Sequence, residues 1–333
     1  MELKAEQNKK YKKILALAAI VFIYFVPTIF KSNQYFLVIG CYILIYSVAA
    51  SGLDVLSGYC GQISLGHAAY FAIGAYVSAC LNKYFEIPVF FTMLIGAVLA
   101  AAIGAVIAWP STKLVYHFLS LATISFGAIV NQMIRVSPGR ITGDAVGFVT
   151  APISLFGTKL SSYDKFFIFA FTVLLITLLV KNNLVNSRLG RAFIAIRENS
   201  YAANGTGINV RRYKVIAFAT SAFFTGYAGA MYTHLIRYIT PDQFKQILSV
   251  YLLTMLMFGG TGSLLGPIVG VICVQLLTES LRFAEEYQML IYGVILFTVI
   301  VAFPGGIYKV IKPSNLLRRI QNRRAGSYEG GGE

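Results

Sequence analysis

The sequence predicts an all-α fold, that of a polytopic membrane protein with about eight to ten transmembrane helices, some of them short or broken at glycine-rich stretches. Of its 333 residues, 57% are hydrophobic and 12% are charged, and the mean hydropathy is +0.70. A soluble domain carries about 25% charged residues. Apolar runs close to the roughly 20 residues of a membrane crossing recur along the whole chain. Glycine clusters lie between such runs at 58–66 and 259–266.

Ten apolar runs are candidate spans. They lie at 14–30, 36–56, 63–81, 88–109, 114–134, 165–181, 214–234, 247–258, 264–278 and 288–303. The first resembles a signal peptide, but no small-residue cleavage site follows it, so we interpret it as a retained helix. The runs at 247–258 and 264–278 are short for a crossing of about 20 residues. If they are half-helices that meet at the glycines between them, the alternative is eight or nine full spans.

The charges beside these spans predict the orientation of the chain. Ten spans put both termini on one side, whose segments hold 19 of the 28 Lys and Arg residues and six of the 13 acids. The net charge is then about +13 on that side and about +2 on the other, as the positive-inside rule expects. We therefore predict a basic cytoplasmic N-terminus at 1–13, a single membrane domain at 14–308 and a basic cytoplasmic tail at 309–333.

Several classes of function have no support in the residues. The basic residues lie beside spans and not on one soluble face, so the net charge of +15 predicts no nucleic-acid partner. The cysteines have no C-x-x-C spacing, and we interpret them as packing residues with no metal: Cys41, Cys60, Cys80 and Cys273. No catalytic motif occurs, and the dipeptide Gly-Lys, which a Walker A motif needs, is absent. The chain is therefore predicted not to be an enzyme.

The longest polar stretch, 186–214, makes up most of a predicted cytoplasmic loop at 182–213 and ends at the first residue of the next span. Good helix formers from Arg191 to Arg197 predict one short helix, and Asn199 or Ser200 can cap a second through Ala202 and Ala203. Gly205 and Gly207 can end that second helix in the left-handed conformation. Two short helices on a membrane face can dock a soluble partner. The alternative is a solvated loop with no partner. The long external loop at 135–164 also has two interpretations. It is either a connector with a small hairpin or a docking site for an external protein.

Residues 51–78 carry polar groups at or near membrane depth. Asp54, Gln62, Ser64 and His67 are candidates for a solute path, because ionisable groups there are functional by default and non-helical backbone is tolerated only in protein or beside water. The alternative for Asp54 and His67 is a capped, solvated position at a helix end. For Gly74 we favour close helix packing.

The two glycine breaks align with each other if one residue is skipped, a weak sign of an internal repeat. Interrupted spans in corresponding halves indicate a binding site in transporters. The glycines expected to shape the breaks are Gly58, Gly61, Gly66, Gly259, Gly260, Gly262 and Gly266.

Three stretches that together span about 50–305 resemble one family, the membrane permeases of bacterial branched-chain amino acid ABC importers of the LivM type. The first reads Gly58-Tyr59-x-Gly61-Gln62-x-Ser64-Leu65-Gly66-His67-Ala68-Ala69-Tyr70-Phe71. The second comprises Arg188-x-Gly190-Arg191-Ala192, Ala195-Ile196-Arg197-Glu198-Asn199, Ala202-Ala203-x-x-x-Gly207-Ile208-Asn209-Val210 and Lys214. The third is Met257-x-Gly259-Gly260-x-Gly262-Ser263-x-x-Gly266-Pro267. Three departures stand out: Tyr201 replaces Glu, Asp54 stands where Asn is expected, and Pro304-Gly305-Gly306-Ile307 replaces Pro-x-Gly-Leu.

The resemblance implies one of two different permease subunits in the inner membrane, with both termini cytoplasmic, in an importer for Leu, Ile or Val. Its implied partners are the second permease, an extracytoplasmic solute-binding protein, membrane lipid and two cytoplasmic ATPases, which hold ATP and Mg²⁺, so that this chain carries no cofactor. Alternatives are a related ABC importer for urea or short amides, or an ATP-independent channel or carrier.

The site residues follow from this resemblance together with the residues themselves. The solute path comprises Asp54, Gln62, Ser64 and His67, with Tyr70 and Phe71 as its apolar wall. The expected contacts to the ATPases are Arg191, Phe193, Ile196, Arg197, Ala202, Ala203 and Gly207. Phe193 and Ile196 are expected to insert into an ATPase groove, and Arg191 and Arg197 to form its charged rim. The opposing interpretation packs Phe193 and Ile196 against the chain's own spans.

Overall fold

The computed structural model describes residues 33–111, 116–137, 141–155, 158–159 and 162–281, together with Tyr24, Pro27 and nine residues between 290 and 307. Several predicted segments lie outside the described residues: the basic N-terminus, the basic tail and the stretch 302–305. Most of the span expected at 14–30 and much of the span expected at 288–303 also lie outside them.

The described chain is built from helices, so the all-α prediction is confirmed. Six long helices match predicted spans to within a few residues: α2 (Gln34–Asp54), α3 (His67–Phe85), α4 (Val89–Ser111), α5 (Tyr116–Arg135), α6 (Tyr163–Asn186) and α9 (Val210–Ile236). A π-helical turn, Val55–Tyr59, extends α2. Five of these helices, all but α3, are long and apolar enough to cross a membrane. The chain is a multi-pass membrane protein.

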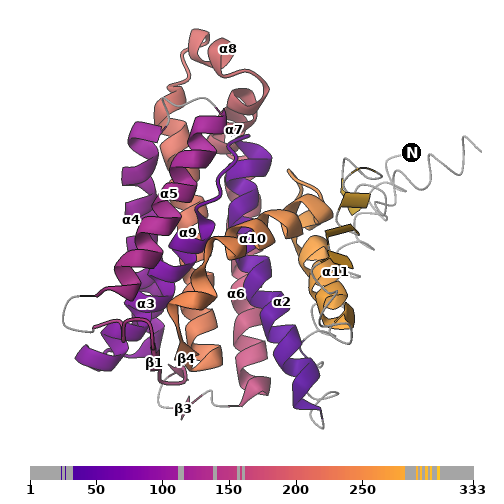
Figure 1. The fold of residues 1–333 in the computed structure, drawn as a ribbon. Coiled ribbons are helices and arrows are strands. Elements are labelled where there is room, and N and C mark those ends of the chain that lie inside the picture. Colours follow the sequence, from indigo (N-terminus) through magenta and orange to yellow (C-terminus); the bar gives the residue numbers. More distant parts are fainter. Residues whose placement is uncertain are drawn as a thin grey trace, which may run out of the picture.

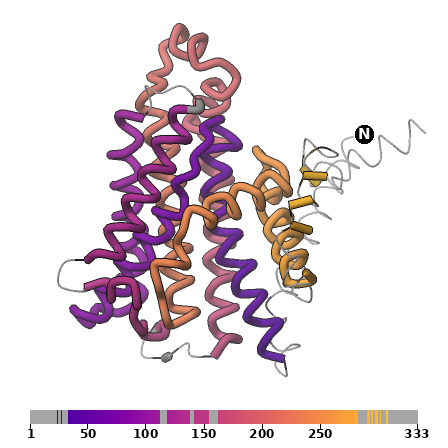
Figure 2. Tube along the Cα trace, in the orientation of Figure 1, coloured from indigo at the N-terminus to yellow at the C-terminus, as the bar shows by residue number. Residues whose placement is uncertain are grey.

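The two short predicted helices are also present, as α10 (Gln246–Gly259) and α11 (Gly266–Ser280). They are joined by the second glycine break and pack against each other and against α2. In the view of Figure 2, α10 crosses the bundle and α11 lies at its side. With 14 and 15 residues, both are shorter than the roughly 20 residues of a full crossing, which agrees with the half-helix interpretation.

Helix α9 lies at the centre of the bundle, packed against α2, α3 and α4 (Figure 1). Small residues allow this close packing. A Cβ added at Gly74 of α3 would lie 1.9 Å from the carbonyl oxygen of Gly226 in α9. The packing role favoured for Gly74 is therefore confirmed, and the backbones of α3 and α9 touch where side chains would separate them.

The loop between α6 and α9 forms α7 (Arg188–Glu198) and α8 (Ser200–Gly205), which lie beyond the long helices at one end of the molecule (Figure 1). Each helix start is capped. The Ser187 hydroxyl accepts from the backbone N–H of Leu189, and the Asn199 side chain accepts from the first two N–H groups after Ser200. Gly207, with φ of +85°, adopts the left-handed conformation just after α8. The two predicted helices are thus confirmed, with Asn199 as the cap.

Short strands lie at the opposite end. β2 (Ser154–Leu155) and β3 (Thr158–Lys159) form the small predicted hairpin, and β1 (Phe148–Val149) pairs antiparallel with β4 (Tyr238–Ile239). The 3-10 helix Pro241–Phe244 follows β4. In it the pKa of Asp242 is held below its usual value by hydrogen bonds from Lys245 and Arg135. The pairing of β1 with β4 therefore ties the loop at 135–164 to the segment that follows α9.

Candidate functional site

A buried ion pair joins the two glycine breaks. Asp54 ends α2, Lys181 lies in the last two turns of α6, and both side chains are fully buried. The Lys181 Nζ lies 2.8 Å from Oδ2 of Asp54. The other carboxylate oxygen, Oδ1, accepts from the backbone N–H of Gly262 at 2.7 Å, and Lys181 also donates to the carbonyl of Ser263 at 3.1 Å. Each charge thus has an ionic partner and a backbone partner, which a buried ion pair needs.

The first break meets the second through Gly58. A Cβ added there would lie 1.9 Å from Oδ1 of Asp54 and 2.5 Å from the backbone nitrogen of Gly262. Gly262 itself has φ of +71°, which favours glycine. Two segments about 200 residues apart in sequence therefore contact each other backbone to backbone.

Helix α7 reaches this junction through Arg197. Its Nη1 donates to the carbonyl of Gly58. A Cβ at Gly61 would lie 2.9 Å from Cγ of Arg197, and one at Gly262 would lie 3.1 Å from Nη1. Because α6 carries Lys181 and continues directly into α7, the loop helices and both breaks form one connected unit. We call this unit, made of Asp54, Gly58, Lys181, Arg197 and Gly262, the junction.

All six residues of the expected solute path are buried in this structure: Asp54, Gln62, Ser64, His67, Tyr70 and Phe71. His67 Nε2 lies 2.7 Å from the Ser221 hydroxyl, and Gln62 donates to the Cys60 carbonyl at 3.3 Å. The solvated alternative for Asp54 and His67 is therefore wrong, because neither side chain has any exposed surface. The path role stays a prediction, since these contacts also suit packing.

The apolar wall residues lie in aromatic surroundings. The Tyr70 ring meets the His67 ring edge to face at 5.6 Å. Phe71 contacts Tyr46, Tyr232 and Phe244, with ring centroids 5.4 to 6.3 Å apart. In this conformation, Phe71 is part of the main core with α2 and α9. Tyr70 packs in a separate cluster with Ala100 of α4, Ala222 of α9 and Phe126 of α5.

The expectation that Phe193 and Ile196 insert into an ATPase groove is wrong for this structure. They are 0% and 1% exposed and pack in a core cluster with Val55, Leu56 and Phe218. The apolar face of α7 is covered by the chain's own helices, so it cannot receive a partner without opening the fold. On α8, Ala203 is also buried and Ala202 is exposed, and Gly207 just after the helix is exposed too.

The outward face of α7 carries different side chains. Arg191, Ile194 and Glu198 are exposed and follow one another at spacings of three and four residues, which puts them on one face of the helix. Tyr201 at the start of α8 is 89% exposed. We call these four residues the outer face of the loop. Arg197 is also exposed but turns toward the junction.

Lys181 is the functional residue that the sequence analysis missed, because as the last residue of the predicted span at 165–181 it was given no role. A signal was present. Lys181 continues a stripe of buried α6 residues, Ala170, Leu174 and Thr177, at helical spacing. A lysine on the inward stripe of a membrane helix calls for an acidic partner, and few acids lie in the apolar segments.

Comparison with known proteins supports the family resemblance that the sequence motifs indicated, and it does so over most of the chain. Residues 35–300 match the family model described as "Branched-chain amino acid transport system / permease component". The high-affinity branched-chain amino acid transport system permease protein LivM of Escherichia coli (strain K12) is 30% identical over 299 residues, 83% of this chain and 70% of that protein. The probable branched-chain amino acid transport permease protein LivH of Methanocaldococcus jannaschii is 24% identical, over 71% of this chain and 78% of its own length.

The name of one relative refers to a different solute. The autoinducer 2 import system permease protein LsrC of Escherichia coli O9:H4 (strain HS) is 23% identical over 320 residues, 90% of this chain and 88% of that protein. No solved structure matches this chain.

Proposed function

We propose a transport function from one premise: the chain belongs to the family of permease components of branched-chain amino acid transport systems. It is one of two different permease subunits of an ATP-driven importer for Leu, Ile and Val. The observation that carries the mechanism is the junction, where Arg197 of α7 and Lys181 of α6 both contact the glycine breaks. A force applied to α7 reaches the breaks through these contacts.

In this proposal α7 and α8 lie in the cytoplasm, as do both termini. The excess of Lys and Arg beside this end of the spans supports that orientation. Two cytoplasmic ATPases dock on the loop and supply the bound ATP and Mg²⁺. A solute-binding protein delivers the amino acid from outside, where the hairpin and the 3-10 helix lie. The similarity of this chain to permeases named LivM and LivH supports a second, different permease as the partner.

The outer face of the loop, and not Phe193 or Ile196, makes the ATPase contact. Its side chains combine one aromatic ring, one aliphatic group and two opposite charges, a composition typical of the energetic centre and rim of a protein interface. A helix that transmits force must be held rigidly. The buried face of α7 holds the helix in place, because it packs against the π-helical turn that extends α2 and against α9.

Replacing Tyr201 with Ala, alone or with Ile194→Ala, is expected to reduce the stimulation of the ATPases by solute-loaded binding protein at least tenfold. Truncating a central interface aromatic costs about 2 kcal/mol or more in binding. The melting temperature of the permease should not change, because both side chains are exposed. The measurement is ATP hydrolysis by the full complex in proteoliposomes.

Phe193→Ala is the matched control in the same loop. It removes a buried ring and should destabilise the fold by about 3–5 kcal/mol, lowering the melting temperature. Normal stimulation in the Tyr201 and Ile194 variants, with normal expression, would contradict docking at the outer face.

A permease for another solute is the second candidate, supported by the similarity to LsrC over 90% of this chain. An importer for urea or short amides is the related alternative. An ATP-independent carrier would require flux without ATPases. Binding of labelled leucine to the partner solute-binding protein would support the proposed solute. A binding protein that does not bind leucine would instead support an importer for another solute, for urea or for short amides.

A further inference from the structure

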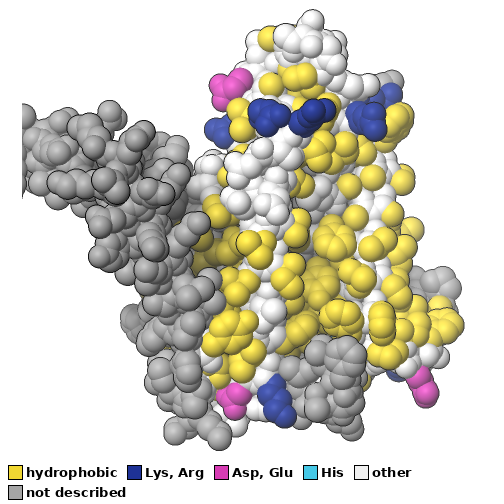
Figure 3. Space-filling model, turned by 180° about the vertical axis from the view of Figure 1, so that it is seen from behind, with side chains coloured by type: hydrophobic (Ala, Val, Ile, Leu, Met, Phe, Trp, Pro, Cys, Tyr) yellow, Lys and Arg dark blue, Asp and Glu magenta, His cyan; other side chains and the backbone are white. Residues whose placement is uncertain are grey.

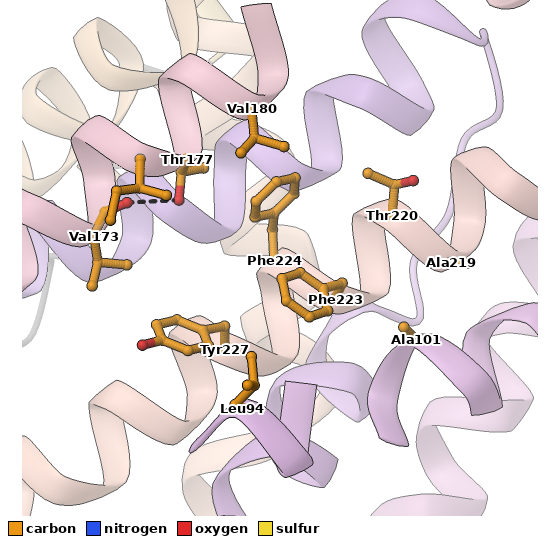
Figure 4. A pocket seen from close by; sticks show the side chains of 11 residues that line it. Leu94, Ala101, Val173, Thr177, Val180, Ala219, Thr220, Phe223, Phe224 and Tyr227 are labelled. Atoms are coloured by element: carbon orange, nitrogen blue, oxygen red, sulfur yellow. Dashed lines mark hydrogen bonds between the residues drawn. The ribbon is translucent and has the colours of Figure 1, made fainter. Parts of the chain in front are cut away.

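An apolar groove runs along the outside of the bundle between α4, α6 and α9. Its volume is about 590 Å³, within the range of about 300–1,000 Å³ typical of small-molecule sites. Figure 4 shows its lining, with the rings of Phe223 and Phe224 facing Val173 and Val180 across the space. The Thr177 and Thr220 hydroxyls both donate back to their own helices, to the carbonyls of Val173 and Ile216. The groove therefore offers an occupant almost no polar contact.

Cationic and aromatic side chains lie on α4 and α9 about two helical turns beyond the lining residues Ala101 and Ala219, toward α7. Trp109 of α4 is 55% exposed, and the Arg211 guanidinium lies 3.9 Å from the centre of its ring. The Arg211 Nε has no hydrogen-bond partner among the described residues. Arg212 beside it is exposed. Figure 3 shows a row of Lys and Arg side chains across this end of the molecule, with hydrophobic side chains below it.

The groove and the cationic end are continuous along two helices. On α9, Arg212, Ala219 and Phe223 recur at helical spacing, and on α4, Leu94, Ala101 and Trp109 do the same. Seven residues separate Arg212 from Ala219, a rise of about 10 Å. The headgroup layer is roughly 5–8 Å thick on each side of the bilayer. With Arg212 in this layer, Ala219 therefore lies at the depth of the acyl chains. A Trp at the level of the headgroups is typical of the membrane interface.

We propose that this groove is a binding site for one anionic phospholipid. An acyl chain fills the space between α4, α6 and α9, and the headgroup phosphate binds Arg211 and Arg212 beside Trp109. Guanidinium groups bind phosphate oxygens through paired N–H donors, and the stacking on Trp109 orients Arg211. Basic sites between transmembrane helices are typical of this kind of lipid recognition. The site is separate from the junction, since none of its lining residues belongs to that unit.

The test is native mass spectrometry of the full chain, extracted in mild detergent from membranes that contain phosphatidylethanolamine, phosphatidylglycerol and cardiolipin. The wild-type chain is expected to retain one phosphatidylglycerol or cardiolipin. The double variant Arg211→Gln/Arg212→Gln should retain at least fivefold less. Arg188→Gln is the matched control, because it removes an exposed cation at the same end of the molecule but on α7, and it should retain lipid normally. Equal retention in wild type and double variant, or no preference over phosphatidylethanolamine, would overturn the proposal.

A second measurement separates a lipid from a protein occupant. Phe223 is replaced by the photo-crosslinking residue p-benzoylphenylalanine, and the full complex is irradiated in membranes. The expected product is the chain with the added mass of a phospholipid. A crosslink to the second permease would show that a protein helix covers the groove and would reject the lipid site.

Discussion

Asp54→Asn is expected to destabilise the protein strongly, although Asn is the residue that the family resemblance leads one to expect at this position. The substitution keeps an oxygen that can accept from Gly262 but removes the charge that compensates Lys181. Breaking a buried ion pair on one side costs about 3–5 kcal/mol, because the remaining charge stays buried without a partner. The measurement is the melting temperature of the purified chain in detergent, together with its abundance in the membrane.

The double variant Asp54→Asn/Lys181→Met should recover most of that loss. It removes both charges and keeps side chains of similar length, which is often neutral for a buried pair. Lys165→Met is the matched control, because it removes an exposed lysine from the other end of α6. If Asp54→Asn melts at the wild-type temperature, or if the double variant is no better than the single one, the pair does not hold the breaks together.

Gly58→Ala should abolish leucine uptake by the complex while leaving the other helices able to insert. The added Cβ would overlap Oδ1 of Asp54 at 1.9 Å and press on the Gly262 backbone at 2.5 Å, so the breaks must separate. Overpacking of this kind typically costs about 1–3 kcal/mol and sometimes more. Separating the breaks also weakens the Arg197 contact to the Gly58 carbonyl.

Gly205→Ala provides the comparison. Nothing lies within 4 Å of a Cβ at Gly205, which is part of α8. Alanine in a helix is favoured over glycine by about 0.5–1 kcal/mol, so uptake should be retained and stability should be unchanged or slightly higher. Both variants are assayed for uptake and for melting temperature. Equal uptake by the two would mean that the close contact at Gly58 is not needed for transport.

The long helices and the loop helices could be predicted from local features of the sequence. An apolar run of about 20 residues has few other structures available in a membrane. Asn199 and Gly207 mark the ends of α8 through capping and left-handed geometry that need no tertiary contact. The aligned glycine breaks also pointed to a special region, although the sequence did not reveal that they touch.

What covers an apolar helix face depends on tertiary structure, and there the sequence was insufficient. Phe193 and Ile196 form one face of α7 whether a partner or the chain itself covers them, and the structure shows that the chain does. The environment of Lys181 was equally ambiguous from the sequence. A lysine near the end of a membrane helix usually extends its ammonium group to the interface, and nothing in the local sequence showed that this one is buried. Only the packing of α6 against α2 brings it to Asp54.

Leucine uptake into proteoliposomes tests the importer proposal most directly. The vesicles contain this chain, its second permease and both ATPases, with the solute-binding protein outside and ATP inside. The proposed function predicts leucine accumulation against its gradient that requires both the ATP and the binding protein. Leucine flux at the same rate through vesicles that lack the ATPases would contradict an ATP-driven importer and would indicate a channel or carrier.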